Sequence, residues 1–185
     1  RGRRPAFPVP DLGPVAILAA AGLLRRGTLA VHANALRDAE ITALARAGCV
    51  AVHCPGTHAF FRRGEPPVRR WIRAGLRFAI GTDSLASNDA LDVFSEMAHL
   101  AASDPSIPAA RIFEAATATG AAALGDRDAG TLLPGAPAEL IGLAIDVPRS
   151  DADLLDALVR RPRIAAVVPA AVERKAEVPS PRRGS

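Results

Sequence analysis

The segment RDAEITALARAGCVAVH, residues 37–53, is the most informative about the fold because it joins a helix to a strand through a single glycine. Apolar residues recur with helical spacing over residues 37–47, Asp38 lies near the start, and Gly48 is a suitable C-terminal stop. Residues 49–53 (CVAVH) are apolar up to the final histidine, as expected for a short buried strand. The segment therefore predicts a helix followed directly by a buried strand.

Similar units lie on both sides of this segment. Residues 28–32 (TLAVH) form another apolar strand, and residues 66–74 predict a helix that leads into a third strand at 76–80 (LRFAI). The tripeptide Arg-Ala-Gly closes both helices immediately before a strand. Strands separated by helices require a parallel sheet with right-handed crossovers. The fold class is therefore α/β, as a doubly wound sheet or as a (β/α) barrel.

The remaining chain is mainly helical. A polar loop is expected after the strand at 49–53, and the Ala-rich helix at 108–124 is expected to break near Gly120. Short strands around a Pro-Gly turn are expected at 129–145. The other predicted elements are helices at 15–24, 90–102, 108–124 and 151–159 and a strand at 164–168.

Composition limits the possible functions. The 185 residues carry a net charge of +4, and many of the arginines lie near the two ends without interleaved aromatic residues, so nucleic-acid binding is not expected. The apolar run at 14–24 is shorter than the roughly 20 residues that span a bilayer. The strand between Cys49 and Cys54 would hold these thiols beyond disulfide reach. We therefore expect reduced cysteines and a cytoplasmic protein.

Each of the three predicted strands leads into a polar residue. These residues are His32, His53 and Asp83. Functional sites of parallel α/β folds form at the C-terminal ends of the strands. Imidazole and carboxylate groups gathered there can bind a metal, move protons and polarise a carbonyl. A histidine at a strand end can also be purely structural, and an aspartate after Gly-Thr can be a turn residue.

The sequences of three short segments resemble those of a known family. Residues 29–34 (LAVHAN), 52–55 (VHCP) and 81–88 (GTDSLASN) resemble the amidohydrolase superfamily, in the branch of cytosine, guanine and S-adenosylhomocysteine deaminases and chlorohydrolases. VHCPGTHAFF followed by GTDSLASN looks most like the aminodeoxyfutalosine deaminase-like members. Residues 130–143 (GTLLPGAPAELIGL) resemble the element that follows the family's barrel and joins a small β-domain.

The resemblance implies a (β/α)8 metallo-dependent hydrolase barrel, of which this chain would be the C-terminal portion. It implies that Asp83 binds a divalent metal, with zinc as the first choice, and moves a proton, and that His32 polarises the group under attack. It places His53, His58, Ser84 and Asn88 where they could touch a small-molecule substrate. The implied organisation is an irregular remnant at 1–12, a barrel portion at 13–128 with strands six to eight, a β-domain portion with the terminal helix at 129–168, and a disordered basic tail at 169–185.

The sequence departs from the family pattern in its metal ligands. Its four histidines form no His-x-His pair, and none precedes His32; they are His32, His53, His58 and His99. We expect His99 to be structural, the N-terminus to be a truncation, and the chain alone to be inactive and prone to associate, with a homo-oligomer as one outcome. The expected reaction is hydrolytic deamination of an aminated purine-like or other heterocyclic ring. Dechlorination, cyclic amide hydrolysis and a catalytically inactive truncated product are the alternatives.

Overall fold

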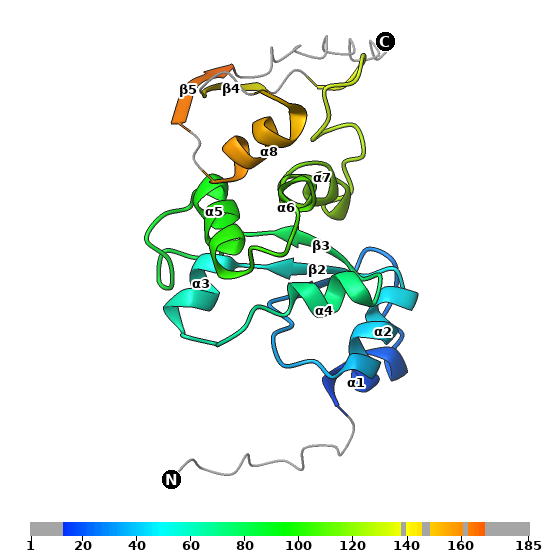
Figure 1. The fold of residues 1–185 in the computed structure, drawn as a ribbon. Helices are drawn as coiled ribbons and strands as arrows, with labels where there is room; N and C mark the ends of the chain where they lie inside the picture. Colours follow the sequence, from blue (N-terminus) through cyan, green and yellow to red (C-terminus); the bar gives the residue numbers. More distant parts are fainter. Residues whose placement is uncertain (1–12, 138–139, 146–148, 161–162, 169–185) are drawn as a thin grey trace, which may run out of the picture.

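The computed structural model describes residues 13–137, 140–145, 149–160 and 163–168 (Figure 1). The regions expected to be an irregular N-terminal remnant and a disordered tail lie outside these residues. The strands are β1 (Leu29–Val31), β2 (Val50–His53), β3 (Arg77–Ile80), β4 (Leu140–Ala144) and β5 (Arg163–Val168). The helices are α1 (Pro14–Ala20), α2 (Asp38–Arg46), α3 (Pro55–Phe60), α4 (Val68–Arg73), α5 (Val93–Ser103), α6 (Ala109–Ala116), α7 (Ala118–Ala123) and α8 (Asp151–Arg160).

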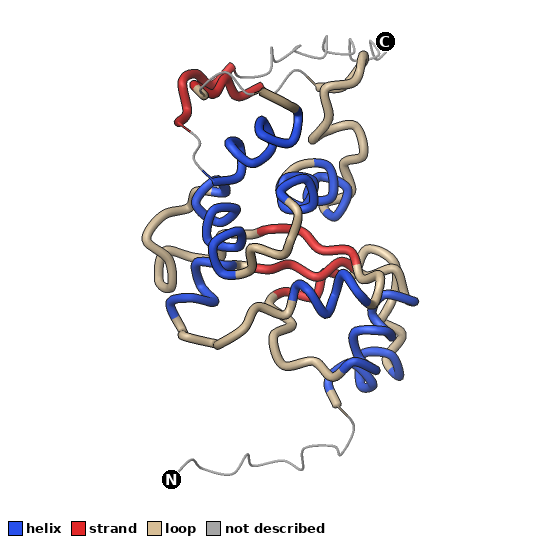
Figure 2. The backbone as a smooth tube through the Cα atoms, viewed as in Figure 1, coloured by secondary structure: helices blue, strands red, loops and turns tan. Residues whose placement is uncertain are grey.

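The first three strands form one parallel sheet in the order β1-β2-β3, with helices between them (Figure 2). In its register Ala30 lies beside Ala51 and Ala51 beside Phe78, and further along the sheet His53 lies beside Ile80. The predicted α/β class and the parallel pairing are confirmed. Strands β4 and β5 form a separate antiparallel pair. Among the described residues of 129–145, β4 is the one strand, so the short strands predicted around the Pro-Gly turn do not pair with each other across it.

The hydrophobic core lies between the sheet and its helices. Ala51 and Phe78, which share one face of the sheet, are buried in the same cluster as Trp71 of α4. Helix α8 packs against α5 and α6 (Figure 1). Val159 of α8 is fully buried. Val31 belongs to the opposite face of the sheet and is 53% exposed, so the helices cover the two faces unequally.

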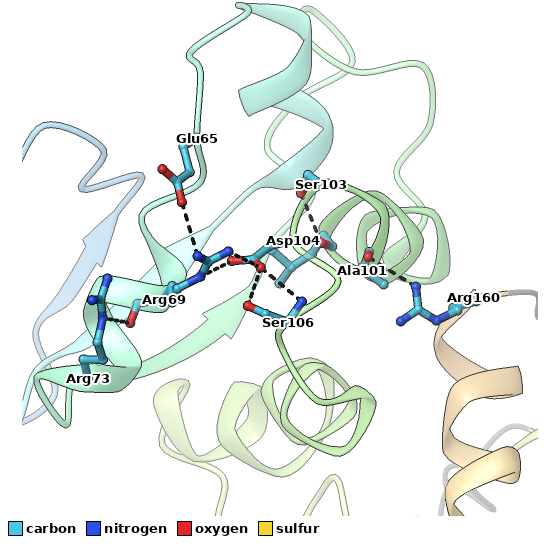
Figure 3. A network of polar contacts seen from close by, with 9 residues as sticks. Glu65, Arg69, Arg73, Ala101, Ser103, Asp104, Ser106 and Arg160 are labelled. Atoms are coloured by element: carbon cyan, nitrogen blue, oxygen red, sulfur yellow. Dashed lines mark hydrogen bonds and ion pairs between the residues drawn. The ribbon is translucent and has the colours of Figure 1, made fainter.

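One polar network ties α4 to the end of α5. The Arg69 guanidinium donates two hydrogen bonds to the Asp104 carboxylate, at 3.1 and 2.6 Å, and Ser106 donates to the same carboxylate from its backbone and its hydroxyl (Figure 3). Asp104 is buried, and the hydrogen bond from Arg69 is the main cause that holds its pKa below the usual value. The buried carboxylate is therefore stabilised by paired donors.

Two local predictions were wrong. The expected polar loop after β2 contains helix α3, in which Pro55 supplies the fixed first-turn φ and residues 55–58 are buried. Helix α1 ends at Ala20 rather than at residue 24, and Gly22 follows with a φ of 71°. The Ala-rich helix does break near Gly120, at Thr117, and the backbone of Gly130 passes so close to this break that a Cβ there would lie 2.7 Å from the Thr117 carbonyl carbon.

Among the described residues, no helix combines the length and the apolar character that crossing a bilayer requires. Cys49 and Cys54 are both buried free thiols, as predicted.

Candidate active site

His32 and Asp83 meet at the C-terminal edge of the parallel sheet. His32 directly follows β1 and Asp83 lies three residues after β3, so strand β2 separates their strands. Their side chains nevertheless converge, with 3.4 Å between His32 Nε2 and Asp83 Oδ2. The two side chains are 41% and 31% exposed, which leaves both accessible to a small molecule. A partly protected pair of this kind can exchange protons with a bound reactant.

The backbone around this pair is fixed in an uncommon conformation. Positive φ values occur at His32 (65°), Ala33 (42°) and Asp83 (57°). The His32 amide donates to the Val52 carbonyl at 2.8 Å, and the Gly81 amide donates to the His53 carbonyl at 2.8 Å. Side chains other than glycine rarely adopt positive φ, and such residues concentrate at functional sites. The sheet edge therefore holds both candidate catalytic residues against a conformational cost.

His53 and His58 lie together on the helix-covered side of the sheet. Their rings are 5.2 Å apart, and the His53 ring is 5.9 Å from the Trp71 ring. Both histidines line a cavity of about 360 Å³ that also contacts α5 at His99. The His58 ring contacts the Asn34 amide oxygen at 3.2 Å and the Gly64 carbonyl at 3.1 Å. These contacts involve neither His32 nor Asp83, so substrate contact by His53 and His58 remains a prediction.

Burial controls the protonation of two groups near the pair. It is the main cause that lowers the pKa of His53 to about 3, and the charges of His58 and His32 act in the same direction. Burial also raises the pKa of the Cys54 thiol to about 11, with further contributions from the negative charges of Asp83 and Glu96. His53 is therefore a neutral imidazole at neutral pH, and Cys54 is a thiol rather than a nucleophilic thiolate.

The loop after β3 places the other two predicted substrate residues differently. Ser84 is exposed directly after Asp83, and substrate contact at this position remains a prediction. Asn88 is half-buried, and its amide donates to the Thr82 carbonyl at 2.8 Å and to the Glu96 carboxylate. Sequence reasoning did not find Glu96, although it is the only acidic residue in residues 93–103. A lone acid within an apolar helix was the available signal.

The described residues supply only part of a zinc site. Catalytic zinc takes three protein ligands and keeps one open position. His32 and Asp83 offer two donors of the right chemistry, and no group of three or more histidine, cysteine or acidic side chains within the described ranges could hold a metal. A metal at this edge would therefore need further ligands.

Comparison with known proteins identifies the same family as the motifs. The profile of the Amidohydrolase family matches residues 9–171. The chain is 39% identical over 142 residues to a 5-methylthioadenosine/S-adenosylhomocysteine deaminase of Haloarcula marismortui, which covers 73% of this chain and 33% of that protein. It is 37% identical over 135 residues to a 5′-deoxyadenosine deaminase of Methanothermobacter thermautotrophicus, covering 69% and 31%. The chain thus spans about a third of the length of these relatives.

Solved structures show the same relationship. An adenosine deaminase of Xanthomonas campestris with bound zinc superposes with a TM-score of 0.71 at 34% identity, over 79% of this chain and 36% of that one. Atrazine chlorohydrolase of Arthrobacter aurescens, complexed with zinc, gives 0.74 at 26% identity, over 84% and 38%. Aminofutalosine deaminase of Helicobacter pylori shares the fold, with a TM-score of 0.70 at 19% identity over 78% and 37%. The chain therefore belongs to the amidohydrolase family.

Proposed function

We propose that this chain forms part of a metal-dependent amidohydrolase that removes ammonia from an aminated purine-like ring by hydrolysis. The convergence of His32 and Asp83, 3.4 Å apart, is the observation that carries the proposal. The deaminases among the relatives support the choice of reaction. In this proposal β1, β2 and β3 are the sixth, seventh and eighth strands of a (β/α)8 barrel, and β4 and β5 belong to a flanking β-domain.

Each member of the pair has a distinct task in this reaction. The Asp83 carboxylate accepts a proton from the water that attacks the ring carbon and delivers it to the departing amino nitrogen, which leaves as ammonia. The His32 imidazole donates a hydrogen bond to the ring atom on which negative charge develops. A divalent metal such as zinc, which Asp83 would help to bind, lowers the pKa of water and so supplies the nucleophile at neutral pH.

A second candidate reaction is hydrolytic dechlorination. It is favoured by the similarity to atrazine chlorohydrolase, with a TM-score of 0.74. His32 would again polarise the ring and Asp83 would again accept a proton from the attacking water, but chloride would leave as an anion and Asp83 would release its proton to solvent. Cyclic amide hydrolysis would also use the same pair.

The experiment compares the 185-residue chain with the complete product of the gene that encodes it, each supplied with zinc. Ammonia and chloride release are measured with 5′-methylthioadenosine, S-adenosylhomocysteine, 5′-deoxyadenosine and atrazine. We expect the complete product to release ammonia from the adenosine-like substrates and the chain alone to be inactive, because its described residues supply fewer than three metal ligands. Chloride release without ammonia release would replace deamination by the second candidate.

The matched variants of the complete product are D83N and D89N. Asp89 is an exposed carboxylate on the same loop, so its neutralisation controls for loss of charge alone. D83N should lower the turnover number by at least about 1,000-fold, because both metal binding and proton transfer lose their carboxylate, whereas D89N should retain near-normal activity. Equal activity of D83N and D89N would contradict the proposal.

A further inference from the structure

Glu96 of α5 is a buried carboxylate with two hydrogen-bond donors and, within the described residues, no ion-pair partner. Its Oε2 accepts from the Gly56 amide at 2.7 Å, and its Oε1 accepts from the Asn88 side-chain amide. Burying a carboxylate away from water is unfavourable unless hydrogen bonds replace its hydration. An acidic residue at this position therefore calls for an explanation other than core packing.

The hydrogen bonds of Glu96 lead directly to the candidate active site. Asn88 has two amide hydrogens, of which one is directed to Glu96 and the other to the Thr82 carbonyl at 2.8 Å. Thr82 immediately precedes Asp83, whose φ of 57° is uncommon for a residue with a side chain. The position of the Asp83 carboxylate is thus linked to Glu96 through one side chain and one peptide group.

The other carboxylate oxygen of Glu96, Oε2, contacts the segment that follows β2. Gly56 lies in the first turn of α3, and a Cβ at this position would lie 2.7 Å from both Asn88 Oδ1 and Glu96 Oε1. The close approach of the Gly56 backbone therefore leaves no room for a larger residue. Through this approach a single carboxylate connects the segments after β2 and β3.

We propose that Glu96 is a positioning residue that acts through Asn88 and the Thr82 carbonyl to hold the Asp83 carboxylate against His32. The consequence for catalysis rests on the proposed function, whereas the positioning itself does not. Replacing Glu96 by glutamine preserves the shape of the side chain but leaves it one carbonyl oxygen as an acceptor. That oxygen can accept from the Gly56 amide or from the Asn88 amide, so the glutamine NH2 group must face the other donor. The contact between Asp83 and His32 should then loosen.

The first experiment reads this contact by NMR in the 185-residue chain without an activity assay. The change in the His32 Hε1 chemical shift caused by D83N is measured in the wild-type, E96Q and E114Q backgrounds. Glu114 is a glutamate of α6 whose side chain is 50% exposed, and it controls for loss of one negative charge. We expect E114Q to retain the effect of D83N and E96Q to reduce it to less than about half, because coupling between two side chains requires their contact.

A double variant separates positioning from stability. In E96Q/N88D the glutamine amide can donate to the new carboxylate at position 88 and its oxygen can accept from Gly56, so the link between the two segments is restored. The new carboxylate cannot donate to the Thr82 carbonyl when ionised. We therefore expect the unfolding temperature to recover from its value in E96Q while the His32 response to D83N stays low. The proposal would be overturned if the double variant recovered both the unfolding temperature and the His32 response to D83N. It would also be overturned if E96Q alone kept the full His32 response.

The activity of the complete gene product provides the second readout. E96Q should lower the turnover number of the deaminase by about 100-fold with little change in KM, because a small displacement of a catalytic group affects the chemical step. E114Q should have no effect, and a loss in E96Q expressed in KM alone would count against positioning. Absence of turnover in the wild-type protein would defeat the proposed function and leave the NMR comparison to decide the role of Glu96.

Discussion

At the scale of single residues, the sequence predicted the meeting of His32 and Asp83 because the carboxyl ends of parallel strands share one edge of a sheet. The roles of the two residues rest on the family resemblance and stay predictions. The surroundings of His53 were not predictable, because an apolar strand buried on both faces does not indicate which way its last residue points. Glu96 accepts hydrogen bonds from Asn88, 8 residues earlier, and from Gly56, 40 residues earlier, and no pattern along the sequence indicates these two partners.

The low pKa of His53 predicts a pH dependence of folding. Burial lowers this pKa to about 3. When the pH is below the ordinary histidine pKa of about 6.5, the unfolded chain therefore binds a proton at His53 that the folded chain does not bind. The free energy of unfolding should therefore fall by about 1.4 kcal/mol per pH unit below about pH 6.5 from this residue alone, and recover as the pH rises.

Urea unfolding at about pH 7.5 and about pH 5 measures this contribution. In H53Q the loss of stability between the two pH values should be smaller than in the wild type by about 2 kcal/mol. H99Q replaces an exposed histidine and should behave as the wild type does. Parallel pH profiles for H53Q and the wild type would show that His53 is protonated in the folded chain.

At the scale of elements, the repeated helix-glycine-strand unit was predictable because its hydrophobic periodicity changes at one glycine. Helix α3 was missed because its six residues PGTHAF carry loop-like composition, and contact with α5 overrides this local preference. The break at Thr117 lies three residues before Gly120, the glycine near which the sequence predicted it.

The link between α4 and α5 predicts unequal costs for two carboxylate substitutions. D104N should lower the free energy of unfolding by about 2 kcal/mol, because the buried Asp104 accepts charged hydrogen bonds from Arg69 (Figure 3). E114Q, which removes the exposed Arg111–Glu114 pair, should change it by less than about 0.5 kcal/mol.

Equilibrium denaturation at neutral pH makes this comparison. Because the pKa of Asp104 is lowered in the fold, its contribution is present above the unfolded pKa of about 3.9 and is lost as the pH falls through the folded value. The difference between D104N and the wild type should therefore shrink in acid. Equal stabilities of D104N and E114Q at neutral pH would show that the buried pair contributes no more than the exposed one.

At the scale of the whole molecule, the sheet exposes apolar surface on the face that carries Val31. Val31 belongs to the edge strand β1 and is 53% exposed. An uncovered apolar edge strand can pair with another chain, so we expect the 185-residue chain to self-associate with rising concentration. V31K should shift the association to higher concentration. L124K, at a residue 82% exposed after α7, should have a much smaller effect.

Sedimentation velocity over a range of concentrations distinguishes these cases. A wild-type chain that stays monomeric at high concentration would contradict the expectation, as would equal effects of the two lysine variants. The three parallel strands in the described part of the chain follow from its local patterns, but the exposure of the face that carries Val31 does not.

The positive φ of Asp83 bears on the evolution of this protein. A glycine would adopt the same backbone angle without steric cost, so D83G should unfold at a higher temperature than D83A, by the equivalent of about 1 kcal/mol. Differential scanning calorimetry of the two variants would reveal the difference, and equal midpoints would show that the angle costs nothing. Glycine would be the more stable choice at this position, so the aspartate carries a conformational cost that its proposed role in the active site would explain.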